Sequence, residues 1–128
     1  MGEESMPIEE LAVDKERVSS LFKTCAPLFL ALGDNVRQDI ILDIADADND
    51  GVNINYLTER TKLSRPAVVY HLKILKDCGL VRTEKKGALV YYFLGLEDKI
   101  NTISEFITLL KTLILEKKKL RMKDLRKC

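Results

Sequence analysis

The sequence predicts a mainly α-helical fold that carries one small β-hairpin, an α+β class. Apolar residues recur at three- and four-residue spacing over several stretches, and this period is typical of amphipathic helices. Late in the chain, two short runs rich in Val, Leu, Tyr and Phe flank a polar segment, as the strands of a hairpin do. The length of 128 residues suits one compact domain with a real core.

The N-terminal third contains two expected helices. The first covers about residues 15–32, and Pro27 should break it or change its direction, because proline removes a helical hydrogen bond. Asp34 is a candidate N-cap for a second helix over about residues 35–47. The side chains of this helix that we expect to point inward are Ile40, Ile41 and Ile44.

The middle of the chain has the order of a helix-turn-helix. A very short strand at residues 52–54 and a short helix at 55–61 follow a polar turn. A tight connection then leads to Ser64, a good N-cap, and to Pro66 in the first helical turn. This second helix should end at Gly79, because glycine tolerates the left-handed conformation of a helix cap.

A hairpin and a long helix complete the chain. Strands at residues 80–84 and 89–94 are joined by residues 85–88, where Gly87 permits a tight turn. A final helix over about residues 97–126 has apolar residues at alternating three- and four-residue steps, the spacing of a helix–helix seam. A short helix, a turn, a second helix and a hairpin form the winged helix-turn-helix arrangement.

Charge is segregated along the chain although the net charge is only +1. Residues 1–50 carry 12 acidic and 4 basic side chains, whereas residues 51–128 carry 17 basic and 8 acidic ones. A basic half of this kind favours a nucleic-acid partner, because lysine and arginine neutralise backbone phosphates.

The final helix also predicts self-association. A helix of about 30 residues is about 45 Å long, which is longer than the domain it belongs to. Its apolar surface therefore needs a partner, and we expect a homodimer through this helix and the N-terminal one. The predicted dimerisation residues are Leu21, Phe22, Ile103, Ile107, Leu110 and Ile114.

We accordingly divide the chain into three parts. Residues 1–13 form an acidic N-terminal tail. Residues 14–96 form a winged helix-turn-helix DNA-binding domain that includes the N-terminal dimerisation helix. Residues 97–128 form a long C-terminal dimerisation helix.

Three stretches of sequence resemble one family of regulators. Residues 63–81 (LSRPAVVYHLKILKDCGLV) resemble the recognition helix and following strand of the arsenic-repressor (ArsR) family. Residues 28–37 (LFLALGDNVR) resemble its first helix junction, and residues 86–94 (KGALVYYFL) the second strand of its wing. The resemblance implies a homodimeric transcriptional repressor that binds an inverted-repeat operator.

The sequence departs from that family at its metal sites. Many members bind the sensed metal through a cysteine pair, and the matching positions here are Asn53 and Asn55, which are poor ligands for a soft metal. A second family site uses histidine on the terminal helix, but the only histidine of this chain is His71. We therefore predict no metal site and no cofactor, and the inducer stays unidentified.

A helical wheel separates two faces of the expected recognition helix. Its basic face is free to enter a major groove, where Arg65 would pair with guanine and Val69 or Tyr70 would contact a thymine methyl group. Lys73 and Lys76 are placed for phosphate, as are the basic residues of the wing. The alternative is a merely solvated face. The predicted DNA-binding residues are Ser64, Arg65, Pro66, Val69, Tyr70, Lys73, Lys76, Arg82, Lys85 and Lys86.

Other residues that suggest chemistry have simpler interpretations. His71 lies on the apolar side of the wheel, so we expect a structural histidine bonded to nearby backbone or to a phosphate. Residues 46–51 resemble the start of a calcium-binding loop, but Leu57 occupies the position where such a loop has its glutamate ligand. We therefore expect an acidic turn rather than a calcium site. Cys25 and Cys78 lie among apolar neighbours and are expected to be inert, with a redox switch as the alternative.

These observations favour a DNA-binding transcriptional regulator over other classes. We expect no enzyme, because the chain has one histidine, no Gly-rich phosphate loop and no spacing of a catalytic triad. A winged helix that binds only proteins is the alternative function. No apolar run reaches membrane-spanning length and the start lacks a signal core, so a cytoplasmic location is expected.

Overall fold

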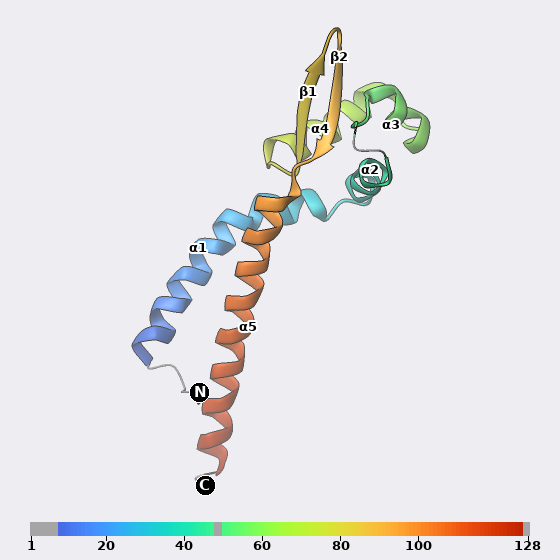
Figure 1. The fold of residues 1–128 in the computed structure, drawn as a ribbon. Helices are drawn as coiled ribbons and strands as arrows, with labels where there is room; N and C mark the ends of the chain where they lie inside the picture. Colours follow the sequence, from blue (N-terminus) through green and yellow to red (C-terminus); the bar gives the residue numbers. More distant parts are fainter. Residues whose placement is uncertain (1–7, 48–49, 127–128) are drawn as a thin grey trace. The chain divides into compact units, whose positions relative to one another are not determined.

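The computed structural model describes residues 8–47 and 50–126, with side chains described for 15–47 and 50–123. Five helices and one antiparallel hairpin confirm the predicted fold class (Figure 1). No helix in the described part is long and apolar enough to cross a membrane. In chain order the elements are α1 Ile8–Leu32, α2 Asn35–Asp46, α3 Ile54–Thr61, α4 Arg65–Asp77, β1 Val81–Lys86, β2 Leu89–Leu94 and α5 Leu96–Arg126.

The chain forms two compact units. One unit comprises residues 26–100, and the other combines the chain up to Cys25 with the chain from Asn101 onward. The first unit therefore contains α2, α3, α4 and the hairpin, while the second contains most of α1 and most of α5.

Helix α1 is longer than the sequence predicted. It begins at Ile8, not near Lys15, and continues through Pro27 to its end. The extra turns contain good helix formers and neither glycine nor proline, so nothing in their backbone opposes a helix. Buried Cys25 and Leu28 flank the proline. The predicted break at Pro27 therefore does not occur, and the alternative, a change of direction there, stays a prediction.

Each helix of the 26–100 unit begins at a polar cap. The predicted cap Asp34 accepts hydrogen bonds from the backbone N–H groups of Val36 and Arg37. Asn53 caps α3 in the same way, and Ser64 caps α4 as predicted, by accepting from the N–H of Ala67.

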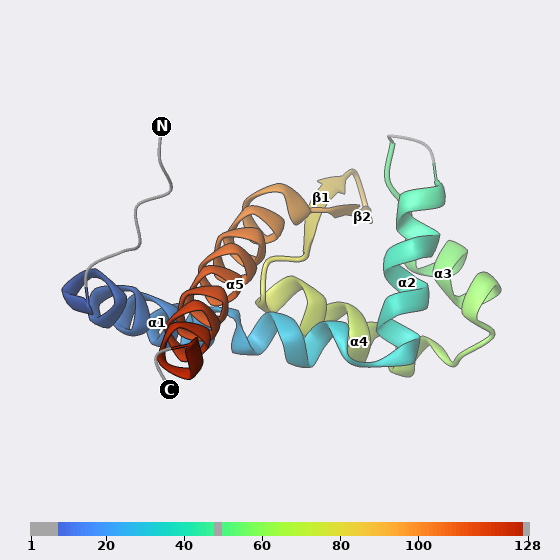
Figure 2. The same cartoon turned by 90° about the horizontal axis from the view of Figure 1, so that it is seen from below.

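The core of this unit lies between α2, α3, α4 and the base of the hairpin. Helix α2 lies beside α3 (Figure 2), and α4 packs against both. Of the three residues predicted to point inward from α2, Ile40 and Ile44 are buried and Ile41 is half-buried. The other buried apolar residues here are Leu28, Ala31, Val52, Leu57, Val68, Leu72, Leu75, Leu80 and Val81.

Helix α4 ends in a left-handed cap at Gly79, as predicted. Gly79 has a φ of 82° and donates its N–H to the carbonyl of Lys76. Leu80 then donates to the carbonyl of Leu75 at 2.9 Å, and both of these leucines are buried. This pair of bonds is a Schellman motif, which satisfies carbonyls at the helix end and turns the chain into β1.

The hairpin is longer than predicted. Its strands pair from Val81–Leu94 to Lys86–Leu89, so only Gly87 and Ala88 form the turn. Lys85 and Lys86 are therefore strand residues rather than turn residues. Gly87 has a φ of 64°, the positive value that a two-residue hairpin turn needs at its first position.

The predicted strand at residues 52–54 is wrong beyond its first residue. Val52 exchanges two backbone hydrogen bonds with Tyr92, at 3.0 and 2.7 Å, and forms an isolated bridge. Ile54 already belongs to α3, because the Asn53 cap begins the helix at that point. The bridge fixes the start of α3 to strand β2.

In the second unit, α1 packs against α5 through a few large side chains. The rings of Phe22 and Phe106 meet edge to face with their centroids 4.5 Å apart, and Arg17 forms an ion pair with Glu105. Val18, Leu21, Cys25 and Phe106 are buried there.

Candidate nucleic-acid interface

The basic face of α4 is exposed as the sequence predicted. All seven predicted residues of this helix and its cap are exposed, and the opposite side carries the buried Val68, Leu72 and Leu75. The helix can therefore present one whole face without disturbing the core. The seven exposed residues are Ser64, Arg65, Pro66, Val69, Tyr70, Lys73 and Lys76.

His71 and Arg37 attach α4 to the end of α1. Nη1 of Arg37 lies 3.3 Å from Nδ1 of His71. Arg37 donates this hydrogen bond, and Nδ1 of His71 accepts it when Nδ1 carries no proton. The same guanidinium donates to the carbonyls of Ala31 at 2.8 Å and Leu30 at 3.1 Å. The sequence prediction of a structural histidine was right in kind, but its partner is a side chain rather than backbone or phosphate.

The basic residues of the wing lie on two faces of the hairpin, because successive strand residues point to opposite sides. Arg82 lies over the ring of Phe93, 4.5 Å from its centroid, and pairs with Glu84 at 2.6 Å. Lys86 lies on the same face, 5.0 Å from the ring of Tyr91. Lys85 alternates to the other face, and within the described chain it has no ion pair or ring contact.

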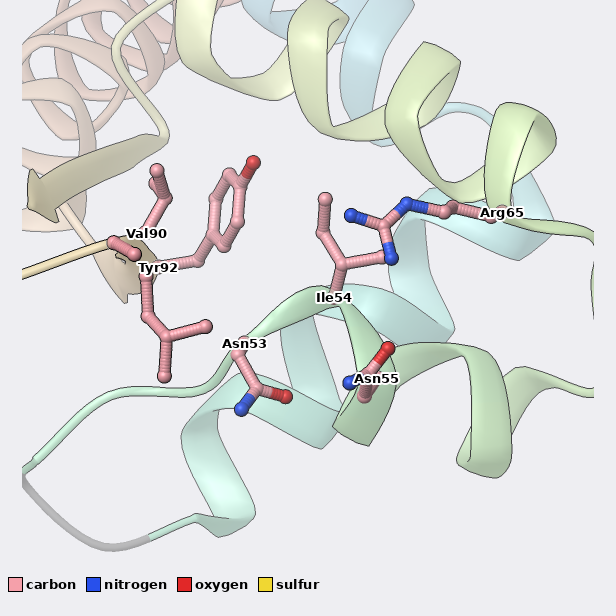
Figure 3. Close-up of a pocket in the computed structure, with 8 residues that line it drawn as sticks. Asn53, Ile54, Asn55, Arg65, Val90 and Tyr92 are labelled. Carbon is pink, nitrogen blue, oxygen red and sulfur yellow. The ribbon is translucent and has the colours of Figure 1, made fainter.

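A cleft of about 210 Å³ lies between α3, α4 and the wing, and the sequence analysis missed it. Figure 3 shows Arg65 extending from α4 and Tyr92 from β2 toward a common region beside Ile54. These residues are far apart in sequence, and no local pattern signals that they meet. The cleft is lined by Asn53, Ile54, Asn55, Arg65, Ala88, Leu89, Val90 and Tyr92.

Burial raises the pKa of the Tyr92 phenol, and the positive charge of Arg65 lowers it in part. The net direction is upward, so the phenol keeps its proton at neutral pH and can donate a hydrogen bond.

Asp46 of the calcium-like turn and Asn53 at a family metal position make contacts within the protein. In the described chain no group of three or more His, Cys, Asp and Glu residues could hold a metal ion. Within the calcium-like turn, Asp46 pairs with Arg60 at 3.0 Å, and residues 48–49 lie outside the described residues. Asn53 uses its side-chain oxygen to cap α3.

The two described cysteines are free thiols. Cys25 is fully buried, and its burial, with the nearby Glu105, raises the pKa of the thiol, which disfavours the reactive thiolate. Cys78 is half-buried and donates its S–H to the carbonyl of Leu75 at 3.4 Å.

The predicted dimerisation residues differ in exposure. Leu21 is buried within its own chain, and Ile103 and Leu110 are half-buried. Phe22, Ile107 and Ile114 are 49%, 51% and 57% exposed. The part of the chain up to Cys25 and from Asn101 therefore keeps large apolar side chains on its surface. The further exposed large apolar residues among the described part of α5 are Ile100, Leu115, Leu120 and Met122.

Comparison with known proteins agrees with this architecture. Residues 53–83 match the model of the family described as bacterial regulatory protein, arsR family. The chain is 31% identical to the transcriptional repressor SdpR of Bacillus subtilis over 83 residues, which cover 62% of this chain and 89% of that protein. It is 33% identical to the arsenical resistance operon repressor of the same organism over 90 residues, covering 70% and 84%.

A solved structure of another regulator has a similar fold. An ArsR-like transcriptional regulator from Rhodococcus sp. RHA1 superposes with a TM-score of 0.71 at 25% identity, covering 85% of this chain and 95% of that one. The helix-turn-helix with its exposed basic face, the hairpin wing and these relatives lead to one conclusion. This chain belongs to the ArsR family of winged helix-turn-helix transcriptional regulators.

Proposed function

We propose that this chain is a homodimeric repressor that occupies an inverted-repeat operator in double-stranded DNA. The observation that carries the proposal is the exposed face of α4, which begins with Arg65 and continues through Lys73 to Lys76. Both Bacillus subtilis relatives are named as repressors, which supports repression rather than activation.

Each recognition helix α4 enters a major groove in this proposal. Val69 and Tyr70 lie at the centre of the exposed face and contact base edges, while Lys73 and Lys76 contact phosphates. Ser64 and Pro66 lie at the start of the helix, close to the DNA backbone. Two-fold symmetry requires the two half-sites to be about 34–36 Å apart.

The wing contacts the adjacent backbone or minor groove through Arg82, Lys85 and Lys86. Lys85 is the strongest candidate of the three, because the other two cations already lie over aromatic rings. A lysine without such a contact is free to follow a phosphate.

The dimer forms through α1 and α5, around the exposed Phe22, Ile107 and Ile114. The predicted set also includes Leu21, which is buried, and Ile103 and Leu110, which are half-buried. We assign DNA recognition to residues 14–96, self-association to residues 97–128 with the N-terminal helix, and neither role to the acidic residues 1–13.

In this proposal the chain has no catalytic function, and it is located in the cytoplasm. The single histidine is used to hold α4, and the family consists of transcriptional regulators. The buried thiol of Cys25 is suited to a reducing compartment, which supports this location.

The test is selection from random DNA duplexes at physiological salt, followed by sequencing, with EDTA in half of the samples. We expect an inverted repeat to be enriched in both halves, since the described residues form no metal site. Enrichment of a single half-site contradicts the dimer. No enrichment at all contradicts DNA recognition and favours a winged helix that binds proteins.

A further inference from the structure

The cleft between α3, α4 and the wing has a positive charge that none of the described residues balances. Arg65 occupies the first position of α4, and the first turns of α3 and α4 contain no acidic residue. A cation beside a helix N-terminus gains nothing from the helix dipole, which favours an anion at that end. Within the described chain Arg65 forms no ion pair, and no carboxylate lines the cleft.

The polar groups around Arg65 are suited to donate hydrogen bonds. Tyr92 is half-buried and faces the cleft with a protonated phenol. The side chain of Asn53 caps α3 by accepting from the N–H of Tyr56 at 2.9 Å, and Figure 3 shows this amide apart from Arg65 and Tyr92. The guanidinium and the phenol therefore form the donor pair for an anion.

Size and the remaining lining residues identify the anion. Ligand pockets for whole small molecules enclose about 300–1,000 Å³. This cleft encloses only about 210 Å³ and is open to solvent, so it fits a single anionic group. The exposed Leu89 and Val90 add an apolar wall, which suits the sugar that accompanies a phosphate in nucleic acid.

We propose that this cleft is a phosphate-binding site in which Arg65 and Tyr92 hold one phosphate group. The DNA backbone is the favoured source, which rests on the proposed function, and free phosphate is the other source of the same chemistry. Arg65 then positions the protein on DNA and does not read guanine. The reading of bases falls to Val69 and Tyr70, which lie farther along the exposed face of α4.

The first experiment replaces single phosphates of the selected operator by neutral methylphosphonates, one at a time. Binding is measured for the wild-type chain and for Arg65→Gln and Tyr92→Phe, after thermal unfolding has shown that both variants fold. We expect one phosphate in each half-site whose neutralisation weakens wild-type binding about tenfold and Arg65→Gln hardly at all. Arg65→Gln should also reduce the slope of log K against log salt by about 0.9 for each half-site on operator and random DNA alike.

Lys76→Gln is the matched control, because it removes one exposed cation from the same helix outside the cleft. It should lower the salt slope by a similar amount while keeping full sensitivity to the phosphate identified with Arg65. Tyr92→Phe should keep the wild-type slope, because it removes a hydrogen bond without removing a charge.

The second experiment titrates inorganic phosphate into the full chain without DNA, against chloride at equal ionic strength. Side-chain signals of Arg65 and Tyr92 are followed by NMR, with Arg65→Gln as the control. Saturable shifts in the wild type that are absent in Arg65→Gln assign the site to free phosphate. A phosphate of the operator whose neutralisation weakens wild-type binding but not that of Arg65→Gln assigns the site to DNA. Either result supports a phosphate site.

Two results separate failure of the site from failure of the proposed function. The phosphate site is refuted by two results together. Arg65→Gln loses operator binding but keeps random-DNA binding, and inorganic phosphate shifts no NMR signal of the wild-type cleft. Arg65 then contacts a base. If the wild-type chain binds no duplex, the proposed function is refuted, and the phosphate titration still tests the cleft alone.

Discussion

Arg37 joins two helices through one guanidinium group. Its side chain is only 12% exposed and donates to two carbonyls at the end of α1 and to His71 of α4. Carbonyls at a helix end have no partner within the helix, and a cation there also gains from the helix dipole. The orientation of the recognition helix therefore depends on a residue that lies outside it.

We predict that Arg37→Met lowers the free energy of unfolding by about 2 kcal/mol, because the half-buried acceptors lose a charged donor. Urea denaturation at neutral pH measures the change. Arg17→Met is the matched control, since Arg17 is exposed and, among the described residues, pairs with Glu105 at the surface. An exposed pair contributes about 0–1 kcal/mol. Equal losses for the two variants would contradict the role of Arg37.

Asp34 makes stability depend on pH at acidic values. Hydrogen bonds from the backbone N–H of Arg37, with the charges of Arg37 and His71 and the N–H of Val36, lower the pKa of this carboxyl below its usual 3.8. Because the pKa of Asp34 is lower in the folded state than in the unfolded state, the ionised carboxyl stabilises the fold, and this contribution is fully present at pH values above the usual pKa. This stability is lost as the pH falls below 3.8 and through the folded-state pKa.

We predict that Asp34→Asn changes this pH dependence more than it changes the fold, because asparagine is an equally good N-cap. Urea midpoints for both proteins should be measured from neutral pH down to pH values below 3.8. The wild type should lose stability relative to Asp34→Asn as the carboxyl takes up a proton. Parallel curves for the two proteins would show that Asp34 does not titrate differently in the folded state.

The sequence predicts single residues well where their function is local. Asp34, Ser64 and Gly79 each act on backbone groups within a few positions, and all three do what their type and place indicate. The partner of His71 is 34 residues away, and the sequence shows nothing that links it to Arg37. Contacts of this kind require the fold to be known.

At the scale of the element, Gly79 determines where α4 stops and β1 starts. Its φ of 82° lies in the left-handed region, which alanine adopts only with strain. A Cβ added there lies 2.6 Å from Cε of Lys99, the flexible end of a side chain that can move aside. The backbone conformation is therefore the main obstacle to substitution.

We predict that Gly79→Ala lowers the free energy of unfolding by about 1–2 kcal/mol. Gly79→Asn should cost clearly less, because asparagine tolerates the left-handed region while it brings the same Cβ. Thermal unfolding of both variants compares the two costs. If asparagine is as harmful as alanine, contact with Lys99 and not the backbone conformation decides the outcome.

Element boundaries are less predictable than element types, and the wing shows why. The sequence suggested a four-residue connection over residues 85–88, which includes Lys85 and Lys86. The actual two-residue turn follows from pairing that extends to Lys86 and Leu89. Likewise α1 extends to Ile8 although its apolar period is clear only after about residue 15.

On the scale of the whole molecule, the two compact units have different surfaces. The 26–100 unit presents basic side chains on α4 and the wing, next to exposed apolar ones such as Val69 and Leu89. The other unit exposes large apolar side chains on α1 and α5. The charge segregation in the sequence indicated the first surface, and the seam spacing of α5 the second. Neither pattern showed the cleft, because three elements from different parts of the chain form it.

The apolar surface predicts how the dimer can be broken without touching the DNA-binding face. Ile107 lies on α5 and is 51% exposed. In a two-fold dimer each substitution counts twice. Burying an isoleucine contributes about 1.5–3 kcal/mol, so Ile107→Asp should weaken self-association by about 100-fold or more. Sedimentation equilibrium measures that loss.

The same variant tests whether dimerisation is needed for operator binding. A monomer reaches one half-site at a time, so Ile107→Asp should bind the full inverted repeat little better than a single half-site. Thr108→Asp is the matched control, because it introduces the same charge at the next, exposed position. It should leave both the dimer and the preference for the full repeat close to wild type. If Ile107→Asp becomes monomeric yet still prefers the full repeat, operator recognition does not depend on the α1–α5 dimer.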